Sequence, residues 1–327
     1  MKPVFADCDW KPVIGALEHA DCIVLMTHCN PDGDGIGSQL ALYHALKSAG
    51  RPVFMHNRDA VPRIYRFLEG SEKVSQGECF TGGRPDLIVS LDCGARSRLG
   101  MPEDFFAGAT LINIDHHASN AGFGDINIVD GRYCATGAMI FDLICTMDKG
   151  LGKAAASAIY TAVLTDTSSF RLANVTPDVH RLTAQLLEAG AEPWPINKGV
   201  YESNSLAGMK LLTACLATLE LDHGGRSAWL NVDQEMYERT HADVEDTEGF
   251  IDYGRRIQGV EIAVFIRPDS EAGTWRVTFR SKNGADVSKL AQEFGGGGHV
   301  HAAGCMMQGS ISEVREQVRQ AVGQILA

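Results

Sequence analysis

Short apolar runs alternate with helix-like segments through the first third of the chain. Residues 22–28 form an apolar run that ends in turn-forming residues, and residues 36–49 follow with a helical period that stops at Gly50. Three further apolar runs of strand length cover residues 51–56, 86–91 and 110–114. Strands that alternate with helices are typical of a mostly parallel sheet flanked by helices. We therefore predict an α/β domain whose ligands bind at the carboxyl ends of its strands.

Helical patterns replace this alternation from about residue 135. The predicted helices cover residues 135–149, 153–166 and 177–189. Residues 191–205 contain prolines and glycine and are predicted as a linker between a first domain over 1–190 and a second over 206–327. The second is predicted as a smaller α+β domain, with helices over 206–219, 246–258, 286–294 and 311–326 and strands over 227–232, 260–267 and 274–281.

Composition excludes several classes of protein. Of the 327 residues, 45% are hydrophobic and 21% are charged, which is ordinary for a globular chain and excludes disordered and collagen-like proteins. No apolar run approaches the roughly 20 residues that span a membrane. The first residues lack the apolar stretch of a secretory signal. We therefore expect a cytoplasmic protein without a membrane partner.

Net charge and cysteine content further restrict the substrates and the kinds of site that the chain can have. The net charge of −12 argues against a protein that coats long duplex nucleic acid through a basic field, and leaves small or short anionic substrates open. Nine cysteines without a C-x-x-C pair fit neither a disulfide framework nor a thiolate zinc site. The acid excess is also compatible with metal ligands, whose charge a bound cation would cancel.

Acidic and histidine side chains are concentrated where the predicted strands end. In chain order they are His28, Asp32 and Asp34, then Asp92, then Asp115, His116 and His117, and finally Asp166 at the end of the helix over 153–166. In a parallel sheet these loops open at one edge, so the side chains converge on a metal site of carboxylates and imidazoles. Such donors suit Mn²⁺, Mg²⁺ or Fe²⁺ better than structural Zn²⁺. Their number favours two ions that share a carboxylate, an arrangement that suits phosphoryl displacement.

Each element of this cluster has a simpler interpretation when it is taken alone. His28 fits a packed histidine at a strand end, and the DGDG segment fits an ordinary turn or a fragment of a calcium loop. Asp92 fits a helix cap, and Asp166 fits a buried acid with hydrogen-bond partners. Four strand-end or helix-end clusters of the same chemistry are much more specific than any one of them, which favours the metal site.

The motifs in these loops resemble those of a known family. THCNPDGDGIGS, VSLDCG, NIDHHASN and TAVLTDTSSF are similar to the four motifs of the DHH phosphoesterase superfamily, and RSKNGADVSKLAQEFGGGGHVHAAG is similar to its DHHA1 substrate-binding domain. The resemblance covers nearly the whole chain and is strongest to the bacterial NrnA-type group. It implies hydrolysis of short single-stranded RNA or dinucleotides to mononucleotides, and of the nucleotide 3′-phosphate 3′-phosphoadenosine 5′-phosphate (pAp) to AMP. It also allows a homodimer.

The resemblance further implies roles for individual side chains. One Mn²⁺ would be held by His28, Asp32 and Asp92, and a second by Asp34, Asp92, His116 and Asp166, with Mg²⁺ or Fe²⁺ as substitutes. Asp92 would bridge the two ions and, with His117, count as catalytic. His117 lies outside both ligand sets and would bind the scissile phosphate or protonate the leaving oxygen. Asp115 is expected to orient a ligating imidazole and is not counted as a ligand.

The glycine run before His299 is the candidate for recognition of the substrate. Backbone without side chains lets N–H groups approach a phosphate closely, although an isolated run of four glycines is more often a flexible loop. With the DHHA1 resemblance, the substrate-binding residues are expected to be Arg280, Ser281, Gly297, Gly298, His299, Ala303 and Gly304.

Three alternatives to the RNA-degrading function stay open. The first is a phosphatase of small nucleotides only, and the second is a phosphodiesterase for linear dinucleotides from cyclic dinucleotide signalling, such as pApA or pGpG. The third is a nucleotide-binding module without catalysis. That module would be expected to lack a metal ligand, whereas every ligand position of the family pattern is filled here.

Overall fold

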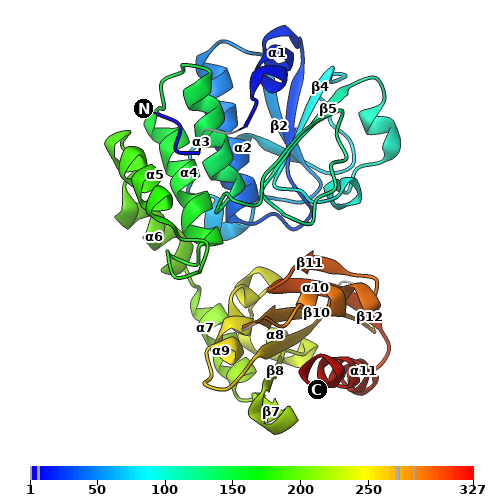
Figure 1. The fold of residues 1–327 in the computed structure, drawn as a ribbon. Helices are drawn as coiled ribbons and strands as arrows, with labels where there is room; N and C mark the ends of the chain where they lie inside the picture. The colour runs from blue at the N-terminus through cyan, green and yellow to red at the C-terminus, as the bar shows by residue number, and fades with distance from the viewer. Residues whose placement is uncertain (1, 6–7, 270, 272, 283) are drawn as a thin grey trace. The chain divides into compact units, whose positions relative to one another are not determined.

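The chain divides into two compact units. The computed structural model describes all residues except 1, 6–7, 270, 272 and 283, and its units cover residues 1–203 and 204–327 (Figure 1). The segment 191–205, expected as a linker, contains helix α6 (Pro193–Tyr201), which packs Ile196 and Val200 into the core of the first unit. The prolines that suggested a break lie at the start of this helix, where proline is well tolerated.

The first unit is built on a parallel sheet. Its strands are β1 (Ile23–Met26), β2 (Val53–Asn57), β3 (Val74–Gln76), β4 (Leu87–Leu91), β5 (Thr110–Asp115) and β6 (Ile126–Val129). They lie in the order β3-β2-β1-β4-β5-β6, and each neighbouring pair is parallel. The four strands expected from the apolar runs are present. The edge strands β3 and β6 were not expected, because their half-exposed residues do not form apolar runs.

Helices cover one face of this sheet. They are α1 (Lys11–His19), α2 (Gly33–Ser48), α3 (Thr136–Thr146), α4 (Lys153–Asp166) and α5 (Pro177–Glu188). Among them α2, α3 and α4 lie side by side along the sheet (Figure 1). Ile23 and Leu25 of β1 pack into the core beneath the helices, with each such side chain contributing roughly 1.5–3 kcal/mol by its burial.

The opposite face of the sheet has a different cover. Val24 and Met26, which alternate with the previous pair, pack against 3₁₀-helices and loops. The 3₁₀-helices of this unit are η1 (Arg63–Tyr65), η2 (Ser71–Lys73), η3 (Arg96–Leu99) and η4 (Glu103–Phe106), and Leu99 and Phe106 of the last two join this second core.

The second unit contains a mixed sheet. Its strands are β7 (Glu220–Asp222), β8 (Ser227–Asn231), β9 (Ile262–Pro268), β10 (Thr274–Ser281), β11 (Gly297–His299) and β12 (Ala302–Gln308), in the order β11-β12-β10-β9-β8-β7. Only β8 and β9 are parallel among the pairs of the described residues. The predicted α/β first domain and smaller α+β second domain are thus both confirmed.

Helices pack on both faces of the second sheet. The helices are α7 (Leu206–Leu216), η5 (His223–Gly225), α8 (Gln234–Thr240), η6 (Val244–Thr247), α9 (Phe250–Arg255), α10 (Val287–Glu293) and α11 (Ile311–Leu326). Alternation along β9 sends Ile262 and Val264 towards α10 and α11, and Phe265 towards α7 and α9. The single helix predicted over 246–258 is wrong, because Gly249 with φ 77° separates η6 from α9.

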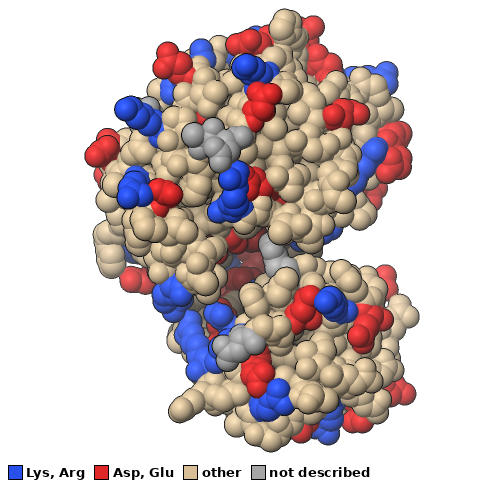
Figure 2. All heavy atoms as spheres, viewed as in Figure 1, with Lys and Arg blue, Asp and Glu red and all other residues tan. Residues whose placement is uncertain are grey.

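The helices and the charged surface residues are consistent with the expectations from hydropathy and net charge. No helix among the described residues is long and apolar enough to cross a membrane. On the face of the first unit that Figure 2 shows, acidic and basic side chains are interspersed. That face therefore carries no broad patch of a single charge.

The second half of the glycine run lies in a strand. Gly297 and Gly298 belong to β11, which pairs with β12. Gly298 has φ 144°, and a Cβ atom there would lie 2.4 Å from the carbonyl oxygen of Ala302 and 2.6 Å from the Cα atom of Ala303. At Gly297 a Cβ atom would meet nothing within 4 Å. Close approach of two strands thus requires glycine at one position and not at its neighbour.

We expect Gly298→Ala to lower the free energy of unfolding by about 1–3 kcal/mol, because alanine cannot take this backbone conformation without strain. Gly297→Ala is the matched control and should change it by less than about 1 kcal/mol. Denaturant unfolding of the two variants measures the difference. Equal stability of both variants would show that β11 does not constrain Gly298.

Candidate metal centre

The strand order brings the predicted metal ligands to one edge of the first sheet. His28 follows β1, Asp92 follows β4 and His116 follows β5, and these three strands are neighbours. The chain continues from β1 to β2 on one side and from β4 to β5 on the other, so the direction of the strand order reverses between β1 and β4. The ligands predicted from this loop pattern therefore meet at the topological switch point of the sheet.

One group of ligands contains His28, Asp32 and Asp92. The Nε2 atom of His28 lies 3.8 Å from Oδ2 of Asp32 and 3.6 Å from Oδ2 of Asp92. Asp32 caps the amino terminus of α2, where its Oδ1 accepts hydrogen bonds from the backbone N–H groups of Asp34 and Gly35, both at 3.1 Å. One carboxylate oxygen therefore anchors the helix and the other faces the imidazole.

A second group surrounds His116. Its Nε2 atom lies 3.6 Å from Oδ2 of Asp34, 3.6 Å from Oδ1 of Asp92 and 3.5 Å from Oδ2 of Asp166. Such separations are too long for good N–H···O hydrogen bonds. Two ligands at about 2.1 Å from a shared ion in tetrahedral arrangement lie about 3.4 Å apart, which these distances approach. The spacing fits ligands around a cation better than ion pairs.

Asp92 belongs to both groups through different atoms. Its Oδ2 faces His28 and its Oδ1 faces His116, while Oδ1 also accepts a hydrogen bond of 3.2 Å from the hydroxyl of Thr136. The backbone of Asp92 has φ 54°, the left-handed region that non-glycine residues rarely occupy. This strained turn at the end of β4 presents the carboxylate to both sides, as a bridging ligand requires.

Backbone carbonyl groups orient both imidazoles. The Nδ1 atom of His28 lies 2.9 Å from the carbonyl oxygen of Cys29, and Nδ1 of His116 lies 3.3 Å from that of Tyr133. A carbonyl only accepts, so Nδ1 carries the proton in each ring and Nε2 is turned to the carboxylates. Histidine ligands are commonly fixed in this way. The role of Tyr133 was not predicted, since the residue lies 17 positions away in the chain.

Asp34 is held by a helix that sequence reasoning did not connect with the site. Its Oδ2 accepts from the N–H group of Thr136 at 2.6 Å, and its Oδ1 accepts from Gly137 N–H at 2.8 Å and from the Ser38 hydroxyl at 3.0 Å. Thr136 and Gly137 begin α3, where backbone N–H groups favour an anion. The one sequence signal was a helix predicted to start near residue 135.

Small residues let α2 approach α4 closely enough to join Asp34 with Asp166. A Cβ atom at Gly33 would lie 2.4 Å from the Thr165 hydroxyl, and one at Gly37 would lie 2.4 Å from the carbonyl oxygen of Ala158. The two helices therefore touch along their glycine and alanine faces. The DGDGIG segment thus supplies the candidate ligands Asp32 and Asp34 and the glycines that pack α2 against α4.

Carboxylates around the imidazoles change their protonation. Burial by itself lowers the pKa of His28, but the carboxylates of Asp32 and Asp92 outweigh it and raise the pKa to about 10. Burial also acts against the charged form of His116, and the surrounding carboxylates, Asp166 foremost, raise its pKa to about 9. Without cations, protons on these rings balance part of the negative charge.

The carboxylates themselves differ in the direction of their shifts. Burial and the charge of Asp92 raise the pKa of Asp34 well above its usual range. Burial, followed by the charges of neighbouring carboxylates, raises the pKa of Asp166 to about 7, although His116 opposes this. Burial also acts to raise the pKa of Asp92, but the imidazoles beside it, His28 foremost, outweigh burial and hold this pKa below its usual range. The site therefore concentrates more negative charge than its own groups neutralise.

His117 has a different partner from the ligating histidines. Its Nδ1 atom is hydrogen-bonded to Oδ1 of the buried Asp115 and lies 3.6 Å from Oδ1 of Asp92. Because Asp115 occupies Nδ1, that nitrogen is not offered to a metal. Asp115 was expected to orient a ligating imidazole; in the structure it orients His117 instead of His116.

The candidate residues of the second unit lie on three neighbouring strands. Gly297 and Gly298 are in β11, Ala303 and Gly304 in β12, and Arg280 and Ser281 at the end of β10. The backbone of His299 is part of β11, and its side chain lies outside the described residues. The structure thus gathers these residues at one edge of the second sheet.

The hydroxyl group of Ser281 makes its hydrogen bonds within the protein. Its hydroxyl is buried, donates to the carbonyl oxygen of Ala285 at 2.6 Å and lies 2.9 Å from Nδ1 of His301. The N–H group of Ser281 also donates to the carbonyl oxygen of His301 at 3.1 Å. Ser281 therefore fixes the turn between β11 and β12, and any contribution to substrate binding passes through that turn.

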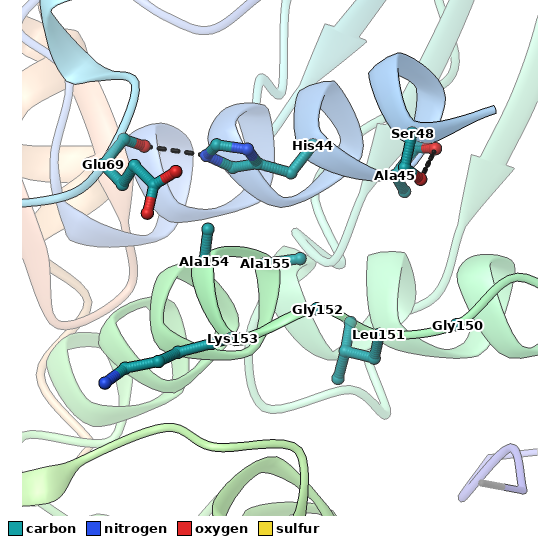
Figure 3. A pocket seen from close by; sticks show the side chains of 10 residues that line it. All are labelled: His44, Ala45, Ser48, Glu69, Gly150, Leu151, Gly152, Lys153, Ala154 and Ala155. Atoms are coloured by element: carbon teal, nitrogen blue, oxygen red, sulfur yellow. Dashed lines mark hydrogen bonds between the residues drawn. The ribbon is translucent and has the colours of Figure 1, made fainter. Parts of the chain in front are cut away.

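A surface pocket of about 530 Å³ lies elsewhere on the first unit. His44 and Ser48 from the end of α2 and Lys153 from the start of α4 are among its lining residues (Figure 3). The candidate metal ligands Asp34 and Asp166 lie at the opposite ends of the same two helices. This pocket is therefore separate from the candidate metal centre.

Known proteins share both the sequence and the architecture of this chain. A model of the DHH family, N-terminal domain, matches residues 22–165, and a model of the DHHA1 domain matches residues 234–327. The bifunctional oligoribonuclease and PAP phosphatase NrnA of Thermus thermophilus is 35% identical over 92% of this chain and 89% of its own length. The protein of the same name from Bacillus subtilis is 26% identical over 89% of this chain and 91% of its own length. A solved exopolyphosphatase-related protein from Bacteroides fragilis covers 96% of both chains, with 29% identity and a TM-score of 0.88.

Replacement of the shared carboxylate should remove bound metal. Asn tolerates the left-handed backbone of Asp92, so Asp92→Asn keeps the turn and removes the charge. We expect loss of at least one divalent ion per chain and a fall in phosphoester hydrolysis of at least about 100-fold. Metal analysis and activity assays measure both. Asp86→Asn, the same change at the other end of β4, is the control and should retain its metal; full metal content in Asp92→Asn would contradict the bridging role.

Metal binding should release protons. In the metal-free site the raised pKa values of His28 and His116, about 10 and about 9, keep both rings protonated near pH 7.5, whereas a metal ligand must be unprotonated. Affinity for a divalent cation should therefore increase as the pH rises from about 6.5 to 8.5. Calorimetric titrations in two buffers of different ionisation enthalpy should give different apparent heats. Identical heats would show that no protons leave.

Proposed function

The chain belongs to the DHH family, in its NrnA-type group with a DHHA1 domain, and is a hydrolase of phosphoester bonds; from this premise we propose that it degrades short RNA oligonucleotides to mononucleotides and converts pAp to AMP. Two ions, Mn²⁺ by preference, would assist both reactions. The relatives named as bifunctional oligoribonuclease and PAP phosphatase match nearly the full length of this chain, which supports the same pair of activities here.

The division of the Asp92 carboxylate between two ligand groups carries the two-ion part of this proposal. One group would comprise His28, Asp32 and Asp92, and the other Asp34, Asp92, His116 and Asp166. All donors are carboxylate oxygens or imidazole nitrogens, a set that suits Mn²⁺ and admits Mg²⁺ or Fe²⁺. When bound, two such ions supply Lewis acidity that stabilises charge on a phosphoryl group and lowers the pKa of water.

His117 is the proposed proton donor to the leaving oxygen. It is buried beside Asp92 without being needed as a ligand, and Asp115 holds its Nδ1 atom. The opposite ring nitrogen then faces away from Asp115 and is the atom able to hold a proton at the substrate. An imidazole fixed by a buried carboxylate is a common arrangement for proton transfer.

We propose that the edge of the second sheet binds one end of the substrate. Arg280 pairs across the strands with Ala302, which pairs in turn with His299, so this row extends over β10, β12 and β11. We propose that Arg280, His299 and the backbone of Gly297, Gly298, Ala303 and Gly304 hold a phosphate group that is not cleaved. Ser281 would contribute by fixing the turn.

The substrate assignment is tested with metal-free purified protein. The protein is incubated with 5′-labelled RNAs of about 2 to 24 nucleotides, with pAp, and with the linear dinucleotides pApA and pGpG, each with and without Mn²⁺. We expect release of mononucleotides that depends on Mn²⁺ and is fastest for the shortest RNAs, together with AMP from pAp.

Other outcomes distinguish the alternatives. Turnover of pAp without RNA would restrict the protein to small nucleotides, and turnover of pApA or pGpG without longer RNA would assign it to linear dinucleotides. Long RNAs cleaved as fast as dinucleotides would contradict a preference for short substrates. Asp92→Asn serves as the inactive reference in every arm.

A further inference from the structure

Asn120 makes an unusually complete set of contacts behind His117. The residue is buried, and its Nδ2 atom lies 2.7 Å from Oδ2 of Asp115, 2.7 Å from Oδ1 of Asn113 and 3.2 Å from the carbonyl oxygen of Cys93. Its Oδ1 accepts from the N–H group of Gly122 at 2.8 Å. A carboxylate accepts and a backbone N–H donates, so the orientation of this amide is fixed by its surroundings.

Asn120 donates to the second oxygen of a fully buried carboxylate. Asp115 has no exposed surface, and its Oδ1 is bound to Nδ1 of His117. A buried carboxylate oxygen that loses its hydrogen-bond donor is destabilised, so Asp115 would be free to rotate without Asn120. The amide therefore fixes the plane of the carboxylate, and the carboxylate fixes the ring of His117.

The same amide is tied to the turn of Asp92. Asn120 and Asn113 both direct Nδ2 at the carbonyl oxygen of Cys93, at 3.2 and 3.1 Å, and Cys93 directly follows the left-handed Asp92. The buried pair of amides thus joins the loop after β4 to the loop after β5. Loss of Asn120 could therefore lower activity by displacing His117 or by displacing the candidate metal ligand Asp92. The experiment below separates these two effects.

We propose that Asn120 is a positioning residue for catalysis, which acts through Asp115 to hold the His117 ring with Nδ1 bonded to Asp115 and its other nitrogen, which would carry the donated proton, towards the substrate. This inference rests on the proposed role of His117 as proton donor. The contacts favour the His117 route, because both short hydrogen bonds of the Nδ2 atom belong to the amide–carboxylate chain and the one to Cys93 is longer.

The test uses two substitutions and one control. Asn120→Ala removes the amide, and Asn120→Asp keeps its shape but replaces the donor with an acceptor facing Asp115. Asn127→Ala is the control: Asn127 makes hydrogen bonds with Gly124 in the same loop and none with Asp115. For both Asn120 variants we expect kcat to fall about 10- to 100-fold, with KM within about threefold and metal content unchanged. Asn127→Ala should behave as the parent chain.

A spectroscopic measurement tests the geometry without turnover. Protein labelled with ¹⁵N-histidine and loaded with Mg²⁺ reports which ring nitrogen bears the proton, and His117 is identified among the 11 histidines by its absence in His117→Gln. We expect Nδ1 of His117 to be fully protonated in the parent chain, whether or not its other nitrogen carries a proton, and to lose this full protonation in both Asn120 variants.

Three results would overturn the inference. These are an unchanged kcat in both Asn120 variants, an unchanged His117 signal, and loss of metal in parallel with activity, which would assign Asn120 to Asp92. Failure of the proposed function appears differently, as a parent chain that turns over neither RNA nor pAp. In that case the ring-nitrogen signals alone still decide whether Asn120 positions His117.

Discussion

Four carboxylates crowded around two imidazoles impose the main constraint on this structure. The carboxylates of Asp32, Asp34, Asp92 and Asp166 lie in neighbouring groups of potential ligands. Protons alone neutralise their negative charge poorly, because the pKa of Asp34 is raised while that of Asp92 is lowered. Unpaired buried charge is costly, so such a cluster persists only where cations bind or where the surrounding fold holds it together. Much of the first unit can be understood as the support that this cluster needs.

That support comes from groups outside the ligand sets. The amino terminus of α3 holds Asp34, and backbone carbonyl groups hold the imidazoles of His28 and His116. Beside the end of β1, Gln39 and Asn57 exchange hydrogen bonds, and Asn57 accepts from the N–H group of Thr27 at 3.0 Å. The amides of Asn113 and Asn120 likewise hold the loop after Asp92 through the carbonyl group of Cys93, and Asn120 also holds the carboxylate of Asp115. Buried amides are therefore a recurring means of fixing the loops in this edge of the sheet.

Glycine permits close packing of the backbone in both units. In the first unit Gly33 and Gly37 bring α2 against α4, and in the second Gly298 lets β11 pack beside β12. Taken alone, a run of four glycines is more often a flexible loop, and glycine also disfavours a strand. The pairing of β11 with β12 supplies the hydrogen bonds that offset this preference.

The sequence by itself determined the chemistry of the site and the class of the fold. Apolar runs and helical periods define β1, β2, β4 and β5 and the helices α3 to α5, because long buried elements leave strong patterns, whereas the short or half-exposed β3, β6 and α6 leave weak ones. Residue type and spacing also define the cluster of carboxylates and imidazoles. Tertiary structure decided which oxygen faces which imidazole, that Asp115 serves His117, and that Thr136 reaches Asp34 across 102 positions of the chain. These contacts arise from the packing of elements far apart in sequence, and no local pattern encodes the direction of a side chain across such a distance.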